Sequence, residues 1–206
     1  MKYYFVMVVL AAIGLGACGS SPPTQYYTLN SIASVGQSST YARAGTPVTI
    51  EKVIIPASLD RPQIVRRVSP NRVDIDETER WPAPLDNMVQ RVLTQDLASR
   101  MASGMVIEPG EPLPASAVRR VVVDIITFEG DLSGRVVLRA EWVATNPDGG
   151  RLSRNEYIII NAGADNAEAL AAGMSQALAQ LADRMATTLN QPDFVSKRDA
   201  GPKSET

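Results

Sequence analysis

The side chain best suited to covalent chemistry is the thiol of Cys18, the only cysteine among 206 residues. The chain contains no histidine, which excludes a Ser-His or Cys-His nucleophile pair, a histidine general base and a histidine-bearing zinc site. A single cysteine forms no disulfide within the chain, so stability must come from packing or from partners. Paired carboxylates or a Ser-Lys dyad leave hydrolysis open as the weakest functional alternative.

The residues before Cys18 have the pattern of a secretory leader. Lys2 gives a positive start, and residues 5–15 form an apolar run that is much shorter than the ~20 residues of a membrane-spanning helix. Leu15-Gly16-Ala17-Cys18 resembles the bacterial lipobox, in which a diacylglycerol is attached to the cysteine sulfur, the leader is cleaved and the new amine is acylated, often with palmitate. This resemblance implies a lipid on Cys18 and no other cofactor. The alternative is an ordinary signal peptide with a chance cysteine near its cleavage site.

The composition is that of a globular protein. The chain is 45% hydrophobic and 20% charged, with a formal net charge of -2, whereas a general nucleic-acid binder normally has a basic excess. Its length suits one domain with a substantial core. We expect a leader at residues 1–17; the lipidated cysteine, a tether, a short strand and a flexible loop at 18–47; the folded domain at 48–190; and a disordered tail at 191–206.

The first part of the chain is predicted to form strands followed by a helix. The helix is expected to start at Pro84, whose missing N–H suits a first turn, and to end near Gly104. Its apolar positions have a three-and-four spacing: Leu85, Met88, Val89, Val92, Leu93, Leu97 and Met101. The preceding strands are expected at residues 26–29, 48–55, 63–68 and 72–76, the last two forming a hairpin.

The alternation of apolar and polar residues predicts which face of the later strands is buried. In the strand at residues 135–143, one set of side chains should face the core: Val136, Leu138, Ala140 and Trp142. The alternate set should face the other side: Arg135, Val137, Arg139 and Glu141. Strands at residues 121–126 and 157–161 complete a predicted three-strand meander.

A second helix is predicted to follow, with Asp165 as N-cap and Glu168 at the third helical position. It has one apolar stripe: Leu170, Met174, Leu178, Leu181, Met185 and Leu189. The predicted fold class is α+β, with a largely antiparallel sheet and two amphipathic helices packed on one face, in the order strands, helix, meander, helix.

The segment from Leu59 to Gln63 is a candidate partner-contact loop. Pro56 and Pro62 stiffen it, and Asp60 and Arg61 offer directional charge. The alternative is a purely structural turn, in which Asp60 caps backbone amides and Arg61 pairs with Asp60.

Trp81, next to Arg80, is a second candidate contact, because tryptophan is favoured at interface hot spots. The alternative is that Trp81 seals the start of the helix. The nearby carboxylates raise the alternative of a calcium loop, but they lack the EF-hand glycine and terminal glutamate. They favour a solvated strand end instead: Asp74, Asp76, Glu77 and Glu79.

Several local motifs together resemble the ABC-type transport auxiliary lipoprotein family. They are Tyr26-Tyr27-Thr28-Leu29, Ile55-Pro56-Ala57-Ser58-Leu59-Asp60-Arg61-Pro62-Gln63-Ile64-Val65, Glu79-Arg80-Trp81-Pro82-Ala83-Pro84-Leu85, Val123-Asp124-Ile125 and Leu138-Arg139-Ala140-Glu141-Trp142. The resemblance covers nearly the whole chain after the leader.

The resemblance implies a non-enzymatic lipoprotein at the outer membrane, facing the periplasm. Its implied partners are an MCE-domain protein and an ABC-type or related inner-membrane complex that together move lipids between membranes. A homo-oligomer is a further expectation. The runner-up function is an envelope assembly factor for an outer-membrane complex such as the lipopolysaccharide export machinery.

Overall fold

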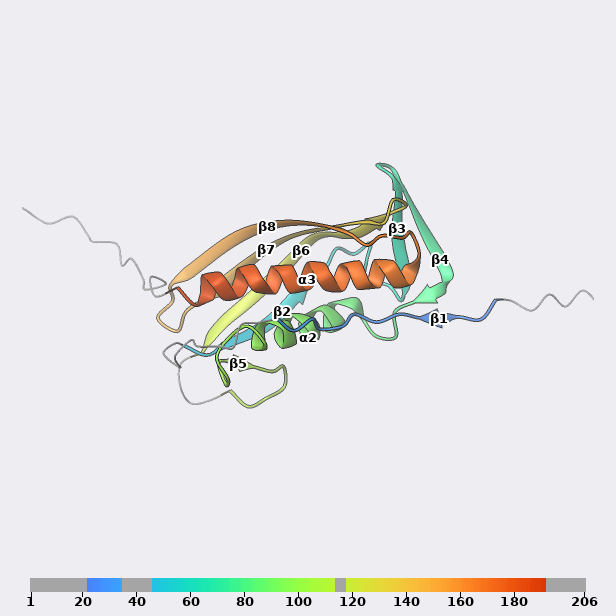
Figure 1. Cartoon of the computed structure of the whole chain (residues 1–206). Helices are drawn as coiled ribbons and strands as arrows, with labels where there is room; N and C mark the ends of the chain where they lie inside the picture. The colour runs from blue at the N-terminus through green and yellow to red at the C-terminus, as the bar shows by residue number, and fades with distance from the viewer. Residues whose placement is uncertain (1–21, 35–45, 114–117, 192–206) are drawn as a thin grey trace, which may run out of the picture.

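The computed structural model describes residues 22–34, 46–113 and 118–191 (Figure 1). Cys18, the leader and residues 192–206 lie outside the described residues, so the lipid site and the disordered tail stay predictions. The elements follow in the order β1 (Gln25–Tyr26), β2 (Val48–Ile54), β3 (Gln63–Ser69), β4 (Arg72–Arg80), α2 (Leu85–Ala98), β5 (Val106–Ile107), β6 (Arg119–Asp131), β7 (Arg135–Thr145), β8 (Arg151–Asn161) and α3 (Ala167–Leu189).

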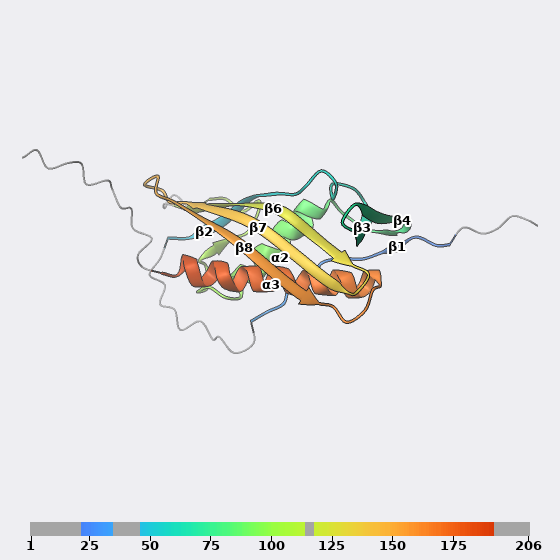
Figure 2. The ribbon, with the colours of Figure 1, turned by 90° about the horizontal axis from the view of Figure 1, so that it is seen from above.

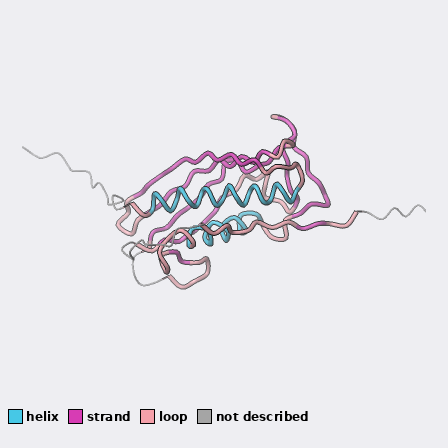
Figure 3. Tube along the Cα trace, viewed as in Figure 1, coloured by secondary structure: helices cyan, strands magenta, loops and turns pink. Residues whose placement is uncertain are grey.

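The strands form one sheet, and both helices cover the same face of it, as predicted for an α+β fold (Figures 1 and 3). The central strand is β6. One of its edges pairs antiparallel with β7, which in turn pairs antiparallel with β8. Its other edge pairs parallel with β2 along the first half and with β3 at the end. The long ladders are therefore antiparallel, while β2 and β3 join the sheet in parallel.

The predicted alternation in β7 is confirmed. Val136, Leu138, Ala140 and Trp142 are all fully buried, and Arg135 and Arg139 are exposed on the other face. The predicted hairpin is also present, with Ser69 opposite Arg72 across β3 and β4.

The apolar stripes of the two helices form the core beneath the sheet. Every residue of both predicted stripes is buried, including Met174 and Met185. At Gly173, α3 lies so close to the sheet that an added Cβ would be 2.8 Å from the Val136 side chain and 2.9 Å from Ala162 Cβ. This close packing requires a residue without a side chain.

Three local predictions were wrong. The first helix ends at Ala98 and not near Gly104, which instead has φ +76° in the turn before β5. The second helix is capped by Asn166, whose side chain accepts a hydrogen bond from Ala169 N, and not by Asp165. Strand β5 was missed because two residues, Val106 and Ile107, give no periodic signal.

The register of β7 can be tested with two neighbouring substitutions. Leu138→Asp should prevent folding, because an unpaired carboxylate buried in the core costs several kcal/mol. Arg139→Asp should leave the domain folded, because this position is exposed. Thermal unfolding followed by circular dichroism should separate the two variants, and equal melting temperatures would show that the two faces are wrongly assigned.

Candidate functional site

The first described segment, residues 22–34, is bound along the domain, and we call it the N-terminal strap. Strand β1 pairs parallel with Glu79 and Arg80 at the end of β4, and Tyr27 N donates to Arg80 O at 2.9 Å. Leu29 is fully buried in the core. The strap then passes the two helices, where Asn30 N donates to Ser175 Oγ of α3 at 3.1 Å.

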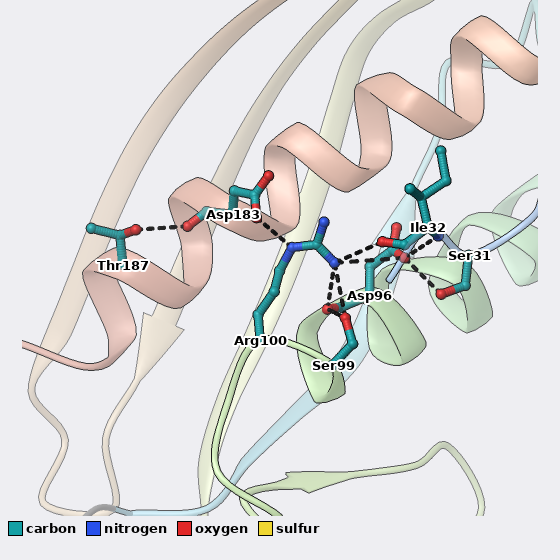
Figure 4. A network of polar contacts seen from close by, with 7 residues as sticks. All are labelled: Ser31, Ile32, Asp96, Ser99, Arg100, Asp183 and Thr187. Carbon is teal, nitrogen blue, oxygen red and sulfur yellow. Dashed lines mark hydrogen bonds and ion pairs between the residues drawn. The ribbon is translucent and has the colours of Figure 1, made fainter. Parts of the chain in front are cut away.

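A polar network fixes the far end of the strap (Figure 4). Ser31 Oγ and Ile32 N each donate to Asp96 Oδ1 of α2 at 2.7 Å. Arg100 Nη1 donates to Ile32 O at 3.1 Å, and Arg100 Nε donates to Asp183 Oδ1 of α3 at 2.5 Å. One guanidinium therefore joins the strap, α2 and α3.

Two charges of this network, on Asp96 and Arg100, are deeply buried. The side chains of Asp96 and Arg100 are 0% and 4% exposed, and the ion pair between Asp96 Oδ1 and Arg100 Nη1 is 3.8 Å long. Burial raises the pKa of the Asp96 carboxyl, while the bonds from Ser31 and Ile32 and the charge of Arg100 oppose the rise. Asp96 Oδ2 is buried and has no hydrogen-bond partner among the described residues.

Sequence reasoning missed Asp96, although a signal was present. Asp96 follows Val92 by four positions and Leu93 by three, so it lies on the apolar face of the helix. A carboxylate at such a position requires a buried partner. Arg100, four residues later, is the partner that this spacing supplies.

The 56–63 loop has a buried anchor and an exposed tip. Leu59 is 4% exposed and its N–H donates to Pro56 O at 2.9 Å. Asp60, Arg61 and Pro62 are exposed. Within the described residues, the side chains of Asp60 and Arg61 form no hydrogen bond or ion pair, so the Asp60–Arg61 pairing of the turn interpretation is not observed.

The other candidate contact residues lie beside the tip of this loop. Trp81 N donates to Pro62 O at 2.7 Å, and the Trp81 side chain is only 4% exposed, as expected of a residue that seals the start of α2. Gln63 and Arg80 face each other across β3 and β4, and both contact Glu77 Oε2, at 2.9 and 3.2 Å. All seven candidates therefore form one cluster, in which Leu59 and Trp81 are buried.

The loop and the strap belong to the same end of the molecule. Arg80 lies opposite Gln63 on one side and opposite Tyr26 of β1 on the other. Strand β4 therefore lies between β1, where the strap begins, and β3, which follows the loop. Figures 1 and 2 show this end, where β1 and β4 meet, together with the start of α3.

The carboxylates of β4 lie within the strand, which continues to Arg80, and not beyond its end as expected. Asp74 and Glu77 are exposed, as expected for solvated groups, whereas Asp76 and Glu79 are half-buried. Asp76 Oδ1 accepts bonds from Thr78 N and Thr78 Oγ1 at 2.7 and 2.6 Å, and these bonds lower the pKa of Asp76. Glu79 pairs with Arg66. In the described part of the chain, no group of three or more acidic, cysteine or histidine side chains could hold a metal ion.

Two shallow hollows lie along the outer side of α2, with volumes of about 330 and 240 Å³. Gln90, Glu108 and Pro109 border both hollows. The Gln90 side chain donates to Ile50 O at 2.7 Å and so covers part of the free edge of β2. Among the described helices, none is long and apolar enough to cross a membrane.

The protein is an α+β domain in which both helices cover one face of the sheet and an N-terminal segment is fixed along the domain. A family model for the ABC-type transport auxiliary lipoprotein component matches residues 27–186, so the chain belongs to this family. The match starts within the strap and ends in α3. The family describes a transport component and not a class of enzyme.

Individual relatives agree with this assignment. The chain is 26% identical over 137 residues to proteins named intermembrane transport lipoprotein PqiC from Escherichia coli K12 and Shigella flexneri, covering 66% of this chain and 72% of theirs. A crystal structure of an uncharacterized protein has the same fold, with a TM-score of 0.68 and 21% identity over 81% of this chain and 99% of that one. So does protein XCC0632 from Xanthomonas campestris, with a TM-score of 0.58 and 18% identity over 78% and 92% of the two chains.

Asp96→Asn should change how the free energy of unfolding depends on pH. Because the pKa of Asp96 is raised in the folded state, the folded protein keeps a proton that the unfolded chain loses just above the ordinary value of about 3.9. The contribution of this carboxyl to the free energy of unfolding is fully present below that value, and it is lost as the pH rises through the raised pKa. Asparagine does not titrate, so the stability of the original protein minus that of the variant should fall over this range.

Urea unfolding of both proteins at several pH values measures this difference. Titrations elsewhere cancel in the subtraction, because the two chains differ at one position. A difference that increases with pH would contradict a raised pKa at Asp96.

Proposed function

We propose that this chain is a non-enzymatic outer-membrane lipoprotein that faces the periplasm and serves as an accessory of an MCE/ABC-type intermembrane lipid transport system. The observation that carries the proposal is the family match over residues 27–186, which starts within the strap and covers nearly all of the folded domain. The naming of PqiC as an intermembrane transport lipoprotein supports the transport role. Cys18, four residues before the described strap, is the attachment point for the lipid.

In this proposal the lipid is the only group attached to the protein, and the domain acts by binding other proteins. The partners are an MCE-domain protein and, through it, inner-membrane transport components, with self-association as a further interaction. The exposed tip of the 56–63 loop is the candidate contact, because Asp60 and Arg61 are unengaged within the described residues. Leu59 fixes the loop from below, which lowers the entropy lost on docking.

Cys18→Ala should release the protein from the membrane. Each buried CH₂ of an acyl chain contributes about 0.8 kcal/mol, so a cysteine with several chains holds a protein firmly. Fractionation after a salt wash tests the anchor, and a Cys18→Ala protein that stays wholly in the membrane would refute it. Density-gradient separation of the unmodified protein tests the outer-membrane location, which rests on Gly19, since aspartate after the cysteine often retains lipoproteins at the inner membrane.

Replacing Asp60 and Arg61 together by alanine should abolish partner binding and leave the fold intact, because the two side chains are exposed. Affinity capture from detergent extracts should recover an MCE-domain protein with the original chain and not with the double variant. The control is Asp124→Ala with Arg139→Ala, which removes one acid and one base from exposed positions on the sheet.

Two results would contradict these assignments. A folded Asp60/Arg61 double variant that still recovers the MCE-domain protein would exclude the loop as the contact. Recovery of an outer-membrane export complex in place of an MCE-domain protein would favour the envelope assembly factor.

A further inference from the structure

We propose that the end of the domain where the strap begins faces the phospholipid surface, so that the domain stands on the bilayer in a fixed orientation. Tyr26 and the turn at residues 82–84 would then lie beside the lipid headgroups. The end that carries the β7–β8 turn and the C-terminus of α3 would point away from the membrane. This inference rests on the lipid anchor at Cys18 proposed above.

The chain between Cys18 and the folded domain is short. Pro22, the first described residue, follows Cys18 by four positions. At ~3.6 Å per residue, even a fully extended chain spans only about 14 Å between them. The start of the strap therefore cannot move far from the lipid-bearing residue.

The strap is bound to the domain, so it does not lengthen this reach. Tyr27 is hydrogen-bonded to Arg80, Leu29 is buried in the core and Asp96 holds Ser31. The folded domain is thus connected to the anchor at the start of β1 and not through a long loop. In Figure 2 this point lies at the same end as the start of α3.

The surface around the start of β1 has a chemistry that suits contact with lipid headgroups. Tyr26 is 64% exposed, the highest value among the large hydrophobic side chains of the described residues. Tyrosine is enriched at membrane interfaces, where its ring meets apolar atoms and its hydroxyl meets water. Pro82, Ala83 and Pro84 are exposed and uncharged. Such a surface can contact headgroups without desolvating a net charge.

The opposite end of the domain is well separated from this surface. The axis of α2 covers about 21 Å and that of α3 about 34 Å, at 1.5 Å per residue. Both helices run along the length of the domain (Figure 2). Ser103, exposed in the turn after α2, therefore lies far from Ala83, which is exposed just before α2.

The test compares fluorescence quenching at these two positions. Since Cys18 is consumed by the lipid, Ala83→Cys and Ser103→Cys each supply one free thiol for a fluorophore. The lipidated full chain is placed in vesicles of phosphatidylethanolamine and phosphatidylglycerol that contain a lipid with a nitroxide on its headgroup. Strong quenching at position 83 and weak quenching at position 103 are expected. Equal quenching, or stronger quenching at position 103, would overturn the proposed orientation.

A longer tether serves as the matched control. A Gly-Ser insertion of about 12 residues after Gly19 adds a flexible chain with an r.m.s. span of about 20 Å, and it leaves the folded domain unchanged. It should remove most of the difference between the two positions. A difference that persists would show that the surface around Tyr26, and not the short tether, orients the domain, which would overturn the part of the inference that rests on the reach of the chain.

One further outcome distinguishes failure of this inference from failure of the proposed function. If Cys18 does not anchor the protein, the protein will already fail to fractionate with membranes, before any quenching is measured.

Discussion

The burial of Arg100 is the constraint on which the arrangement of strap and helices depends. Its guanidinium binds a carboxylate of α3, Asp183, and a backbone carbonyl of the strap, and it lies near Asp96 of α2. A buried charge is tolerated only while its partners stay in place, and removing one partner is strongly destabilising. The strap is thus part of the core structure, because its departure would leave Arg100 and Asp96 with fewer partners in a nonpolar environment.

The elements with a regular apolar period were predictable from the sequence, and those without one were not. The alternation around Leu138 and the stripe of α3 follow directly from the geometry of strands and helices. The N-cap was wrong by one position because Asp165 and Asn166 both have side chains suited to capping, and only the path of the backbone selects between them. The parallel pairing of β2 and β3 with β6 was equally hidden, because it depends on contacts between segments distant in sequence.

The candidate site also has features that were predictable from the sequence and features that were not. The proline spacing correctly indicated an ordered 56–63 loop, because prolines restrict the backbone wherever they lie. Its close association with Tyr26 was not predictable, since it requires β1 to add to the edge of β4. Asp96 was missed for a different reason: a helical period identifies the buried face, but it does not say which distant segment supplies the hydrogen-bond donors of a buried carboxylate. Those donors come from the strap, more than 60 residues earlier.

A bound strap changes what a lipid anchor does for a transport component. If the chain from Cys18 to the start of β2 at Val48 were a free linker of about 30 residues, its r.m.s. span would be about 30 Å and the domain would sample many heights and orientations. Because the strap is bound to the domain, Pro22, the first described residue, stays within about 14 Å of Cys18. The 56–63 loop lies at the same end, so a partner that contacts it must approach within a short distance of the bilayer. Under the proposed function, a partner that delivers or receives lipids would come equally close, so the short tether would place the 56–63 loop near the site of transfer.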